Sequence, residues 1–381
     1  MDQLESKAIN NYLSMLQLKY DIETIYSLVT SQLDGVTAFG LTPYFTLTTA
    51  SILEYFKLDE AEEYKNSDSL KVKDVRLKLK VFEDGYSKSK RMMLNIDYLQ
   101  NEVFKNKLKF KITRGWNIHY NLGIYADENK HVIGNTQYDY YLLQDNRLLK
   151  KNPEEVIKAY NSTPEKFDLR EQTGKDAFEY GRKCGEILGC AHREFEDFDA
   201  SISVPINTPS KKHYYADYNT NKKSTLFPEG EDGKAIRLYL LHTLSTLNYP
   251  LYVLKKYEKD DYGWFLKTYY ISYYYTVQKL RDLQQYLIQN KLLTPEIGSY
   301  FTELDIENAK YFNSIFRNYI MHSNLTDKDG NFLIDSKYLD KNIPLFGLVE
   351  TCFDGMSYQD LKTSIISEAT VVSQSLCKPS N

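Results

Sequence analysis

Apolar side chains recur every three to four positions over residues 2–34, and this spacing predicts a long amphipathic helix. Asp34-Gly35 is a natural stop for that helix, because glycine can adopt the positive φ of a helix C-terminus. Residues 45–57 fit neither the helical nor the strand period, so both structures stay open there.

The apolar period changes to two residues from about position 70. In VRLKLKVF (residues 75–82), apolar positions alternate with Arg76, Lys78 and Lys80, which predicts a half-buried strand with a cationic outer face. Three further stretches extend this picture, namely a strand in KLKFKIT, a hairpin in NLGIYADENKHVIG and a strand in YDYYLLQ. We therefore predict a small antiparallel sheet over residues 70–145.

Helical signals return at Asn152, which can cap a helix whose first position suits Pro153. A longer helix is predicted over residues 173–197. The next 30 residues or so are polar and rich in turn-forming residues, so we place a domain boundary near position 230. The chain then divides into a mixed α+β region of unknown role, residues 1–230, and a helical region, residues 231–381.

The helical region carries four predicted helices. They cover residues 234–257 with a kink near Pro250, residues 261–290, a segment from about Asp305, and residues 357–376. In the third, apolar positions follow the i, i+3, i+4 stripe of a core-facing helix: Phe312, Ile315, Phe316, Tyr319 and Ile320. The expected fold is therefore predominantly α, with a mixed α+β N-terminal half and a C-terminal up-and-down helical bundle.

Composition narrows the classes of protein that remain. A net charge of −4 excludes a protein that coats nucleic acid through a broad positive field, so any RNA contact must be a local patch. Four cysteines, no apolar start and no apolar run of 18 residues are typical of a cytoplasmic protein with free thiols and no membrane span. The 34 tyrosines fit either half-buried packing or stacking on bases.

The stretch FNSIFRNYIMHSNL, residues 312–325, combines packing positions with residues that can do chemistry. Cleavage of RNA without a metal needs a base for the ribose 2′-hydroxyl, an acid for the leaving 5′-oxygen and a cation for the phosphate. His322 can take either proton role, and Arg317 can grip phosphate oxygens with a planar fork. Asn318 can orient Arg317 or contact phosphate. Arg317, Asn318 and His322 are therefore our candidate catalytic residues, with neither a metal nor a cofactor.

The separation of Arg317 and His322 is weak evidence by itself. It recurs at two other places, which we expect to be structural: Arg114 to His119 and Arg237 to His242. Five residues along an ideal helix also turn by about 140°, so Arg317 and His322 do not share a narrow face. Either the last helical turn is distorted or the two side chains flank a groove shared with another helix or subunit.

The segment FRNYIMHSN resembles the signature of the HEPN superfamily (higher eukaryotes and prokaryotes nucleotide-binding), an R-x4-6-H motif with a polar residue after the arginine. The resemblance covers only the C-terminal region. It implies a HEPN-like bundle and a metal-independent endoribonuclease that leaves a 2′,3′-cyclic phosphate and a 5′-hydroxyl. It also implies a homodimer formed through the C-terminal bundle, in a bacterial toxin or phage-defence system with an antitoxin or regulatory partner.

Two cationic segments are weaker candidates for RNA binding. One is a loop that mixes lysines for phosphate with tyrosines for bases, formed by Lys211, Lys212, Tyr214, Tyr215, Lys222 and Lys223. The other is the cationic face of the strand predicted at Arg76, and for both a solvated surface is the competing interpretation. Cys184 and Cys190 are spaced too widely for a zinc knuckle and have no second ligand pair, so we expect buried thiols.

Three functions stay open for the C-terminal helices. They can form an active endoribonuclease, or a HEPN-like module that binds RNA, a nucleotide or a protein without cutting. The third alternative is a packed helix with no site. No glycine-rich phosphate loop and no G-x-S-x-G motif is present, so ATP hydrolysis and serine-hydrolase chemistry have no support in the sequence.

Overall fold

The computed structural model describes residues 3–65, 67–114, 122–143, 151–163, 169–195, 198, 202–209, 212–218, 220, 226–327, 329 and 331–377. As far as β3, its elements are α1 (Gln3–Thr30), α2 (Gly35–Tyr55), η1 (Leu58–Glu60), α3 (Glu62–Lys65), α4 (Val72–Lys78), α5 (Lys80–Glu83), α6 (Tyr86–Arg114), β1 (Leu122–Asp127), β2 (Val132–Asn135), α7 (Thr136–Leu143), α9 (Pro153–Ala159), α10 (Leu169–Glu194) and β3 (His213–Tyr218). The rest are α11 (Glu231–Asn248), η2 (Tyr249–Leu254), α12 (Lys255–Tyr257), α13 (Trp264–Gln289), α14 (Pro295–Glu303), η3 (Ile306–Asn308), α15 (Ser314–His322), η4 (Pro344–Gly347), α16 (Leu348–Cys352) and α17 (Tyr358–Cys377).

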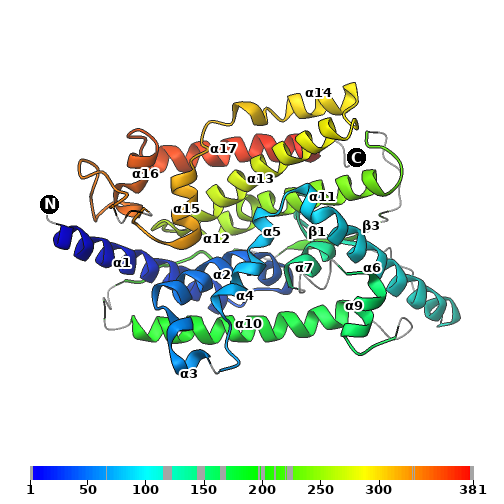
Figure 1. The fold of residues 1–381 in the computed structure, drawn as a ribbon, viewed down its shortest axis with the longest axis horizontal. Helices are drawn as coiled ribbons and strands as arrows, with labels where there is room; N and C mark the ends of the chain where they lie inside the picture. Colours follow the sequence, from blue (N-terminus) through cyan, green and yellow to red (C-terminus); the bar gives the residue numbers. More distant parts are fainter. Residues whose placement is uncertain are drawn as a thin grey trace.

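The chain is predominantly helical, with a small three-stranded sheet, as we expected for the fold class. Several long helices run roughly along the long axis of the molecule, namely α1, α2, α10, α11, α13 and α17 (Figure 1). Of these, α10 lies along one edge and α17 lies toward the other. Helix α13 is central: every residue from Trp264 to Val277 is buried. It packs against α11, α17, α15, α6, α5 and α1.

The predicted hairpin is confirmed, but the other strands expected between residues 70 and 145 are wrong. β1 and β2 pair in antiparallel fashion around a turn at residues 128–131. VRLKLKVF instead forms α4 and α5, KLKFKIT lies within α6, and most of YDYYLLQ lies in α7. The third strand is β3, which pairs with β1 and comes from the segment predicted to be a polar connection.

The error at VRLKLKVF has a physical cause. The buried residues there are Val75, Leu79, Val81 and Phe82. Val75, Leu79 and Phe82 are spaced four and three residues apart, as on one face of a helix. Leu77 is only partly buried and breaks the strand pattern. Leucine and lysine also favour helices, so an alternating run of the two is ambiguous without knowledge of its neighbours.

The helices predicted beyond residue 230 are confirmed in outline. Pro250 lies in the π-helical turn η2, at the predicted kink between α11 and α12. The third helix begins later than expected: Asn313 caps α15 by accepting a hydrogen bond from the backbone N–H of Phe316 at 2.9 Å. Helix α14 was not predicted. A HEPN-like arrangement of these helices stays a prediction.

Buried polar contacts join the two halves of the chain. The Tyr44 hydroxyl lies 2.7 Å from the Ser272 hydroxyl, and the Lys267 ammonium donates to the Asp21 carboxylate at 2.6 Å. Helix α11 packs against α6 and β2, and α15 packs against α2. The site carried by α15 is therefore completed by residues from the first half of the chain. The expected division near position 230 stays a prediction.

Helix α2 is long and apolar enough to cross a membrane, but 67% of its most apolar window is buried within the protein. Asp34 caps its start by accepting hydrogen bonds from the backbone N–H groups of Val36 and Thr37. Gly40 allows a very close approach to the Tyr249 ring, because a Cβ at position 40 would lie 2.1 Å from Tyr249 Cε2. These features are those of a helix in the core of the protein.

Helix α7 buries a carboxyl group. Asp139 is 6% exposed, and its Oδ2 accepts a hydrogen bond from the Tyr125 hydroxyl at 3.3 Å. Burial raises the pKa of Asp139 to about 7, and the Tyr125 hydrogen bond only partly offsets that cost. The core therefore holds an acid that is half protonated near neutral pH.

Candidate functional site around His322

Helix α15 separates a packing face from a solvent face. Phe316, Tyr319 and Ile320 are buried, as the apolar stripe predicted. Asn318 and His322 are exposed and lie four residues apart, so both point from the same side of the helix. The predicted division of this segment into packing residues and free polar residues is therefore only partly correct, because Ile315 of the predicted stripe is exposed and Arg317 packs against the rings of Tyr274 and Tyr275.

The C-terminus of α15 is fixed to α2. Ser323 follows His322 with a φ of 49°, in the left-handed region, and its backbone N–H donates to the Tyr319 carbonyl at 2.6 Å. The Ser323 hydroxyl also donates to the hydroxyl of Ser51 on α2 at 2.8 Å. This turn places the His322 ring beside the end of α2.

His322 lies against a charged pair from two other helices. Its Nδ1 is 2.9 Å from Nη2 of Arg76 on α4 and 3.5 Å from Oε2 of Glu54 on α2. Arg76 also donates two hydrogen bonds to the Glu54 carboxylate, from Nε at 2.7 Å and from Nη2 at 2.6 Å. We call Glu54, Arg76 and His322 the His322 cluster. The His322 side chain is 55% exposed, so the cluster opens to solvent.

The electrostatics of the His322 cluster favour an ionised carboxylate. Burial alone would raise the pKa of Glu54, but the hydrogen bonds from His322 and Arg76 outweigh burial and lower that pKa below its usual value. Arg76 is permanently charged. Glu54 therefore balances the charge of Arg76 and can also accept a hydrogen bond from His322 when Nδ1 carries a proton.

Two tautomers of neutral His322 are compatible with these contacts. If Nδ1 accepts from Arg76, the proton lies on Nε2, and the ring presents a donor to solvent. If Nδ1 donates to Glu54, Nε2 is an unprotonated base. The same nitrogen thus has a donor and an acceptor within reach, and the tautomer in which Nδ1 donates to Glu54 leaves Nε2 free to accept a proton.

Arg317 lies elsewhere on α15. Its guanidinium carbon is 5.6 Å and 5.9 Å from the ring centroids of Tyr274 and Tyr275 on α13, where cation–π attraction holds it. Burial raises the pKa of Tyr275, and the positive charge of Arg317 works against that rise. Arg317 Nε is buried without a hydrogen-bond partner among the described residues. The structure thus brings Arg76, and not Arg317, into contact with His322.

The sequence contained only part of this site. The sequence pattern presents Arg76 as one cation of a predicted strand face and Glu54 as part of the ambiguous segment at 45–57. Glu54 and His322 are 268 positions apart in the numbering, and no motif spacing links them. Only the packing of α15 against α2 brings these two residues together.

The predicted RNA-binding loop is only partly within the described residues. Lys211, Lys222 and Lys223 lie outside them, and Lys212 precedes β3. Tyr214 and Tyr215 belong to β3 and are both more than half exposed. The Tyr215 ring lies 5.9 Å from that of Tyr125 on the neighbouring strand, so the tyrosines are presented by a sheet, where we expected a loop.

The competing arginine–histidine pairs differ from the His322 cluster. His242 is 5% exposed, and burial together with the positive charge of Lys279 lowers its pKa to about 3. Arg237 donates to the Thr220 carbonyl at 3.2 Å. These contacts fit the structural role expected for that pair. Arg114 ends α6, and His119 lies outside the described residues.

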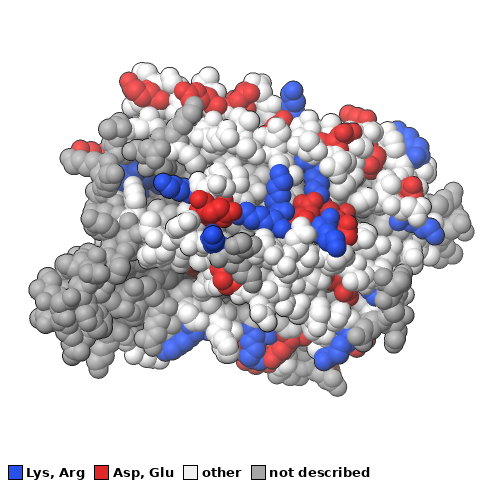
Figure 2. Space-filling view, turned by 180° about the vertical axis from the view of Figure 1, so that it is seen from behind, with Lys and Arg blue, Asp and Glu red and all other residues white. Residues whose placement is uncertain are grey.

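Within the described part of the chain, no metal site accompanies the His322 cluster. Across the described ranges, no group of three or more His, Cys, Asp or Glu side chains could hold a metal ion. Cys184 is buried as expected, whereas Cys190 is exposed. Figure 2 shows Lys and Arg side chains interleaved with Asp and Glu on the described part of one face. A local contact with an anion is therefore the form of recognition that the charges favour.

Comparison with known proteins gives no relative: no family model, no curated protein and no solved structure matches the chain.

Proposed function

We propose that the protein is a metal-independent endoribonuclease whose active site is built on His322. The observation that supports this most is the solvent-open imidazole of His322 held against Arg76 and Glu54, since it joins a titratable group to a fixed cation. The resemblance of the α15 segment to the HEPN motif points to the same chemistry. A cytoplasmic toxin or phage-defence protein is the setting we propose.

The proposed reaction is an attack of the ribose 2′-oxygen on the adjacent phosphorus. In the Nε2-basic tautomer, His322 removes the 2′-hydroxyl proton as the new P–O bond forms. The bond to the 5′-oxygen then breaks, and that oxygen takes a proton from the imidazolium or from water. The products are a 2′,3′-cyclic phosphate and a 5′-hydroxyl, with no cofactor consumed.

We assign to Arg76 the role of the cation that stabilises the phosphate beside His322. Its guanidinium lies beside the His322 ring, where it can stabilise the negative charge that develops on the phosphate. Asn318 lies one turn before His322 on the exposed face of α15 and can donate to a neighbouring phosphate oxygen. Arg317 would contact the substrate farther along, from its position over Tyr274 and Tyr275.

The exposed face of α15 also suits a second copy of the chain. Ile315, on this face, is 52% exposed, and its side chain gives the surface around Asn318 and His322 an apolar contact point. Pairing two α15 helices would bring two His322 clusters together, so we propose a homodimer through the C-terminal bundle. An antitoxin or regulatory protein would cover the same surface.

Incubation of the full chain with total RNA in excess EDTA tests the proposed activity. We expect cleavage to continue, because no step requires a divalent ion, and we expect termini that a 2′,3′-cyclic phosphatase converts for 3′-end ligation. RNA that is bound but stays intact would support the alternative, a non-catalytic RNA-binding or protein-interaction module. The engagement of Arg76 by Glu54 is the contact that favours this alternative.

Two matched variants distinguish the contributions of Arg76 and Arg317 to the cleavage rate. Arg76→Gln should lower the cleavage rate by about 10²-fold, the usual effect of removing one donor to a developing oxyanion. Arg317→Gln should lower the rate by less than about 10-fold, because Arg317 makes no described contact with His322. Single-turnover rates on one RNA oligonucleotide measure both effects, and Arg76→Lys checks that positive charge restores part of the loss. A larger defect in Arg317→Gln would contradict the assignment of Arg76.

A further inference from the structure

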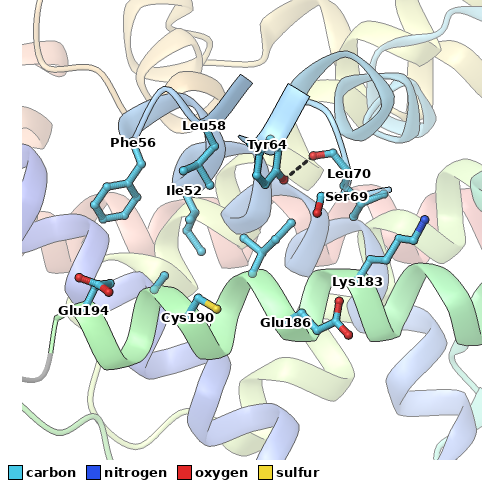
Figure 3. A pocket seen from close by; sticks show the side chains of 12 residues that line it. Ile52, Phe56, Leu58, Tyr64, Ser69, Leu70, Lys183, Glu186, Cys190 and Glu194 are labelled. Atoms are coloured by element: carbon cyan, nitrogen blue, oxygen red, sulfur yellow. Dashed lines mark hydrogen bonds between the residues drawn. The ribbon is translucent and has the colours of Figure 1, made fainter. Parts of the chain in front are cut away.

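A cavity of about 460 Å³ lies between α10 and the segment that joins α2 to α4. Its apolar lining includes Ile52, Phe56 and Leu58 on one side, and Ile187 and Ala191 on α10. Figure 3 shows Ile52, Phe56 and Leu58 across the space from α10, with the Cys190 thiol on the α10 side. Cavities that bind small molecules usually have this size and this predominance of apolar groups.

The cations near the cavity rim are already engaged. The Lys183 ammonium lies 2.9 Å from Asp68 and 3.5 Å from Glu179, and Glu186 accepts a hydrogen bond from Arg182. Arg193, near the end of α10, donates to Cys190 Sγ at 3.4 Å. An anionic ligand would therefore compete with the existing contacts of these cations and would meet the Glu194 carboxylate on the lining, whereas an uncharged ligand disturbs none of these contacts.

One wall of the cavity and both partners of His322, Glu54 and Arg76, belong to one continuous segment of the chain. Ile52 and Phe56 line the cavity, and Glu54 lies between them on α2 and contacts His322. The wall continues through Leu70 to α4, where Arg76 is the other partner of His322. The Asp59 carboxylate accepts from the backbone N–H of Val72 at 3.1 Å and so ties the wall to the start of α4. A ligand that moves this wall must act on both partners of His322.

We propose that this cavity binds an uncharged, mostly apolar small molecule and that its occupancy changes the geometry of the His322 cluster. The binding site does not depend on the proposed ribonuclease activity, because neither the cavity nor the contacts of His322 require RNA. The fluorescence of N-phenyl-1-naphthylamine, an uncharged apolar probe, measures binding to the full chain. Saturable binding at one site is expected.

Blocking the cavity should remove the probe. Ser69→Trp places an indole at the lining, and Ala191→Trp places one on the α10 side; each should weaken probe binding at least about 10-fold. Ile288→Trp, at a half-exposed position of α13, is the matched control and should bind as the wild type does. Equal probe affinity in all of these variants would overturn the proposed site.

The Cys190 thiol gives a second readout that needs no substitution in the cavity lining other than the thiol itself. In a Cys352→Ser, Cys377→Ser background, Cys190 is the remaining exposed thiol among the described residues. At a probe concentration ten times its Kd, alkylation of Cys190 should slow by about 10-fold. Unchanged alkylation with bound probe would place the probe elsewhere and contradict the proposal.

Histidine NMR signals test the link to the His322 cluster. Bound probe should shift the ring proton signals of His322 and leave those of His131, which stacks on Tyr252 at 3.7 Å, unchanged. His322→Gln assigns the signal. A probe that protects Cys190 without moving the His322 signals would overturn the link, whatever the outcome of the RNA cleavage assay.

Discussion

Replacing His322 with glutamine should lower the rate of RNA cleavage by about 10²- to 10⁴-fold, the contribution typical of a general acid–base group. Glutamine can still accept a hydrogen bond from Arg76 and donate one to Glu54, but it cannot transfer a proton at neutral pH. The loss should therefore appear in the chemical step, as a lower single-turnover rate with little change in the Kd for RNA. Rates on a defined RNA oligonucleotide, with binding measured by fluorescence anisotropy, provide both numbers.

The control for His322→Gln is His131→Gln. His131 is another histidine that contacts a carboxylate, since its Nδ1 lies 3.0 Å from Asp127 Oδ2. It belongs to the β1–β2 turn and makes no contact with the His322 cluster, so its replacement should leave cleavage unchanged. Cleavage by His322→Gln at the wild-type rate would exclude His322 as the proton-transfer group and leave RNA binding as its most direct role.

Asp139→Asn should change the pH dependence of stability. The pKa of Asp139 is about 7 in the folded protein and about 3.8 in the unfolded chain, so between these values the folded protein binds a proton that the unfolded chain has lost. The free energy of unfolding of the wild type should consequently fall as pH rises from 4 to 7. The difference in free energy of unfolding between Asp139→Asn and the wild type should therefore be about 3 kcal/mol more in favour of Asp139→Asn at pH 8 than at pH 4.5.

Urea unfolding of both proteins at pH 4.5 and pH 8 measures this difference. Asparagine keeps the size of the side chain and an oxygen that can accept from the Tyr125 hydroxyl, so the change tests charge more than packing. Asp340→Asn, in the connection before η4, serves as the control for an exposed carboxylate. A stability difference between Asp139→Asn and the wild type that stays constant with pH would refute the elevated pKa.

Local sequence signals predicted the elements whose structure depends on neighbours in the chain. The Asn152-Pro153 start of α9 is confirmed by the hydrogen bond from Glu155 N–H to Asn152 Oδ1 at 2.9 Å. The β1–β2 hairpin and the kink at Pro250 are confirmed for the same reason: each is determined by a few adjacent residues. Such features do not require knowledge of the tertiary fold.

Elements decided by tertiary packing escaped prediction. β3 is a strand because β1 offers it an edge, and α4 is a helix because its Val75 and neighbouring α5 residues face a common core. The candidate site shows the same limit. His322 was identified from its own helix, but the residues that touch it come from α2 and α4, and their proximity follows from the fold alone.

The contact between Gly40 and the Tyr249 ring has a consequence for evolution. Any larger residue at position 40 would collide with that ring, whose hydroxyl donates to the Thr37 carbonyl at 2.6 Å and thereby holds η2 on α2. Glycine at position 40 and an aromatic residue at position 249 should therefore be kept or lost together in descendants of a common ancestor. In a diverged chain whose overall identity is too low to reveal kinship, this pair, separated by 209 positions in the numbering, would be a more durable mark of common descent than the short arginine–histidine motif.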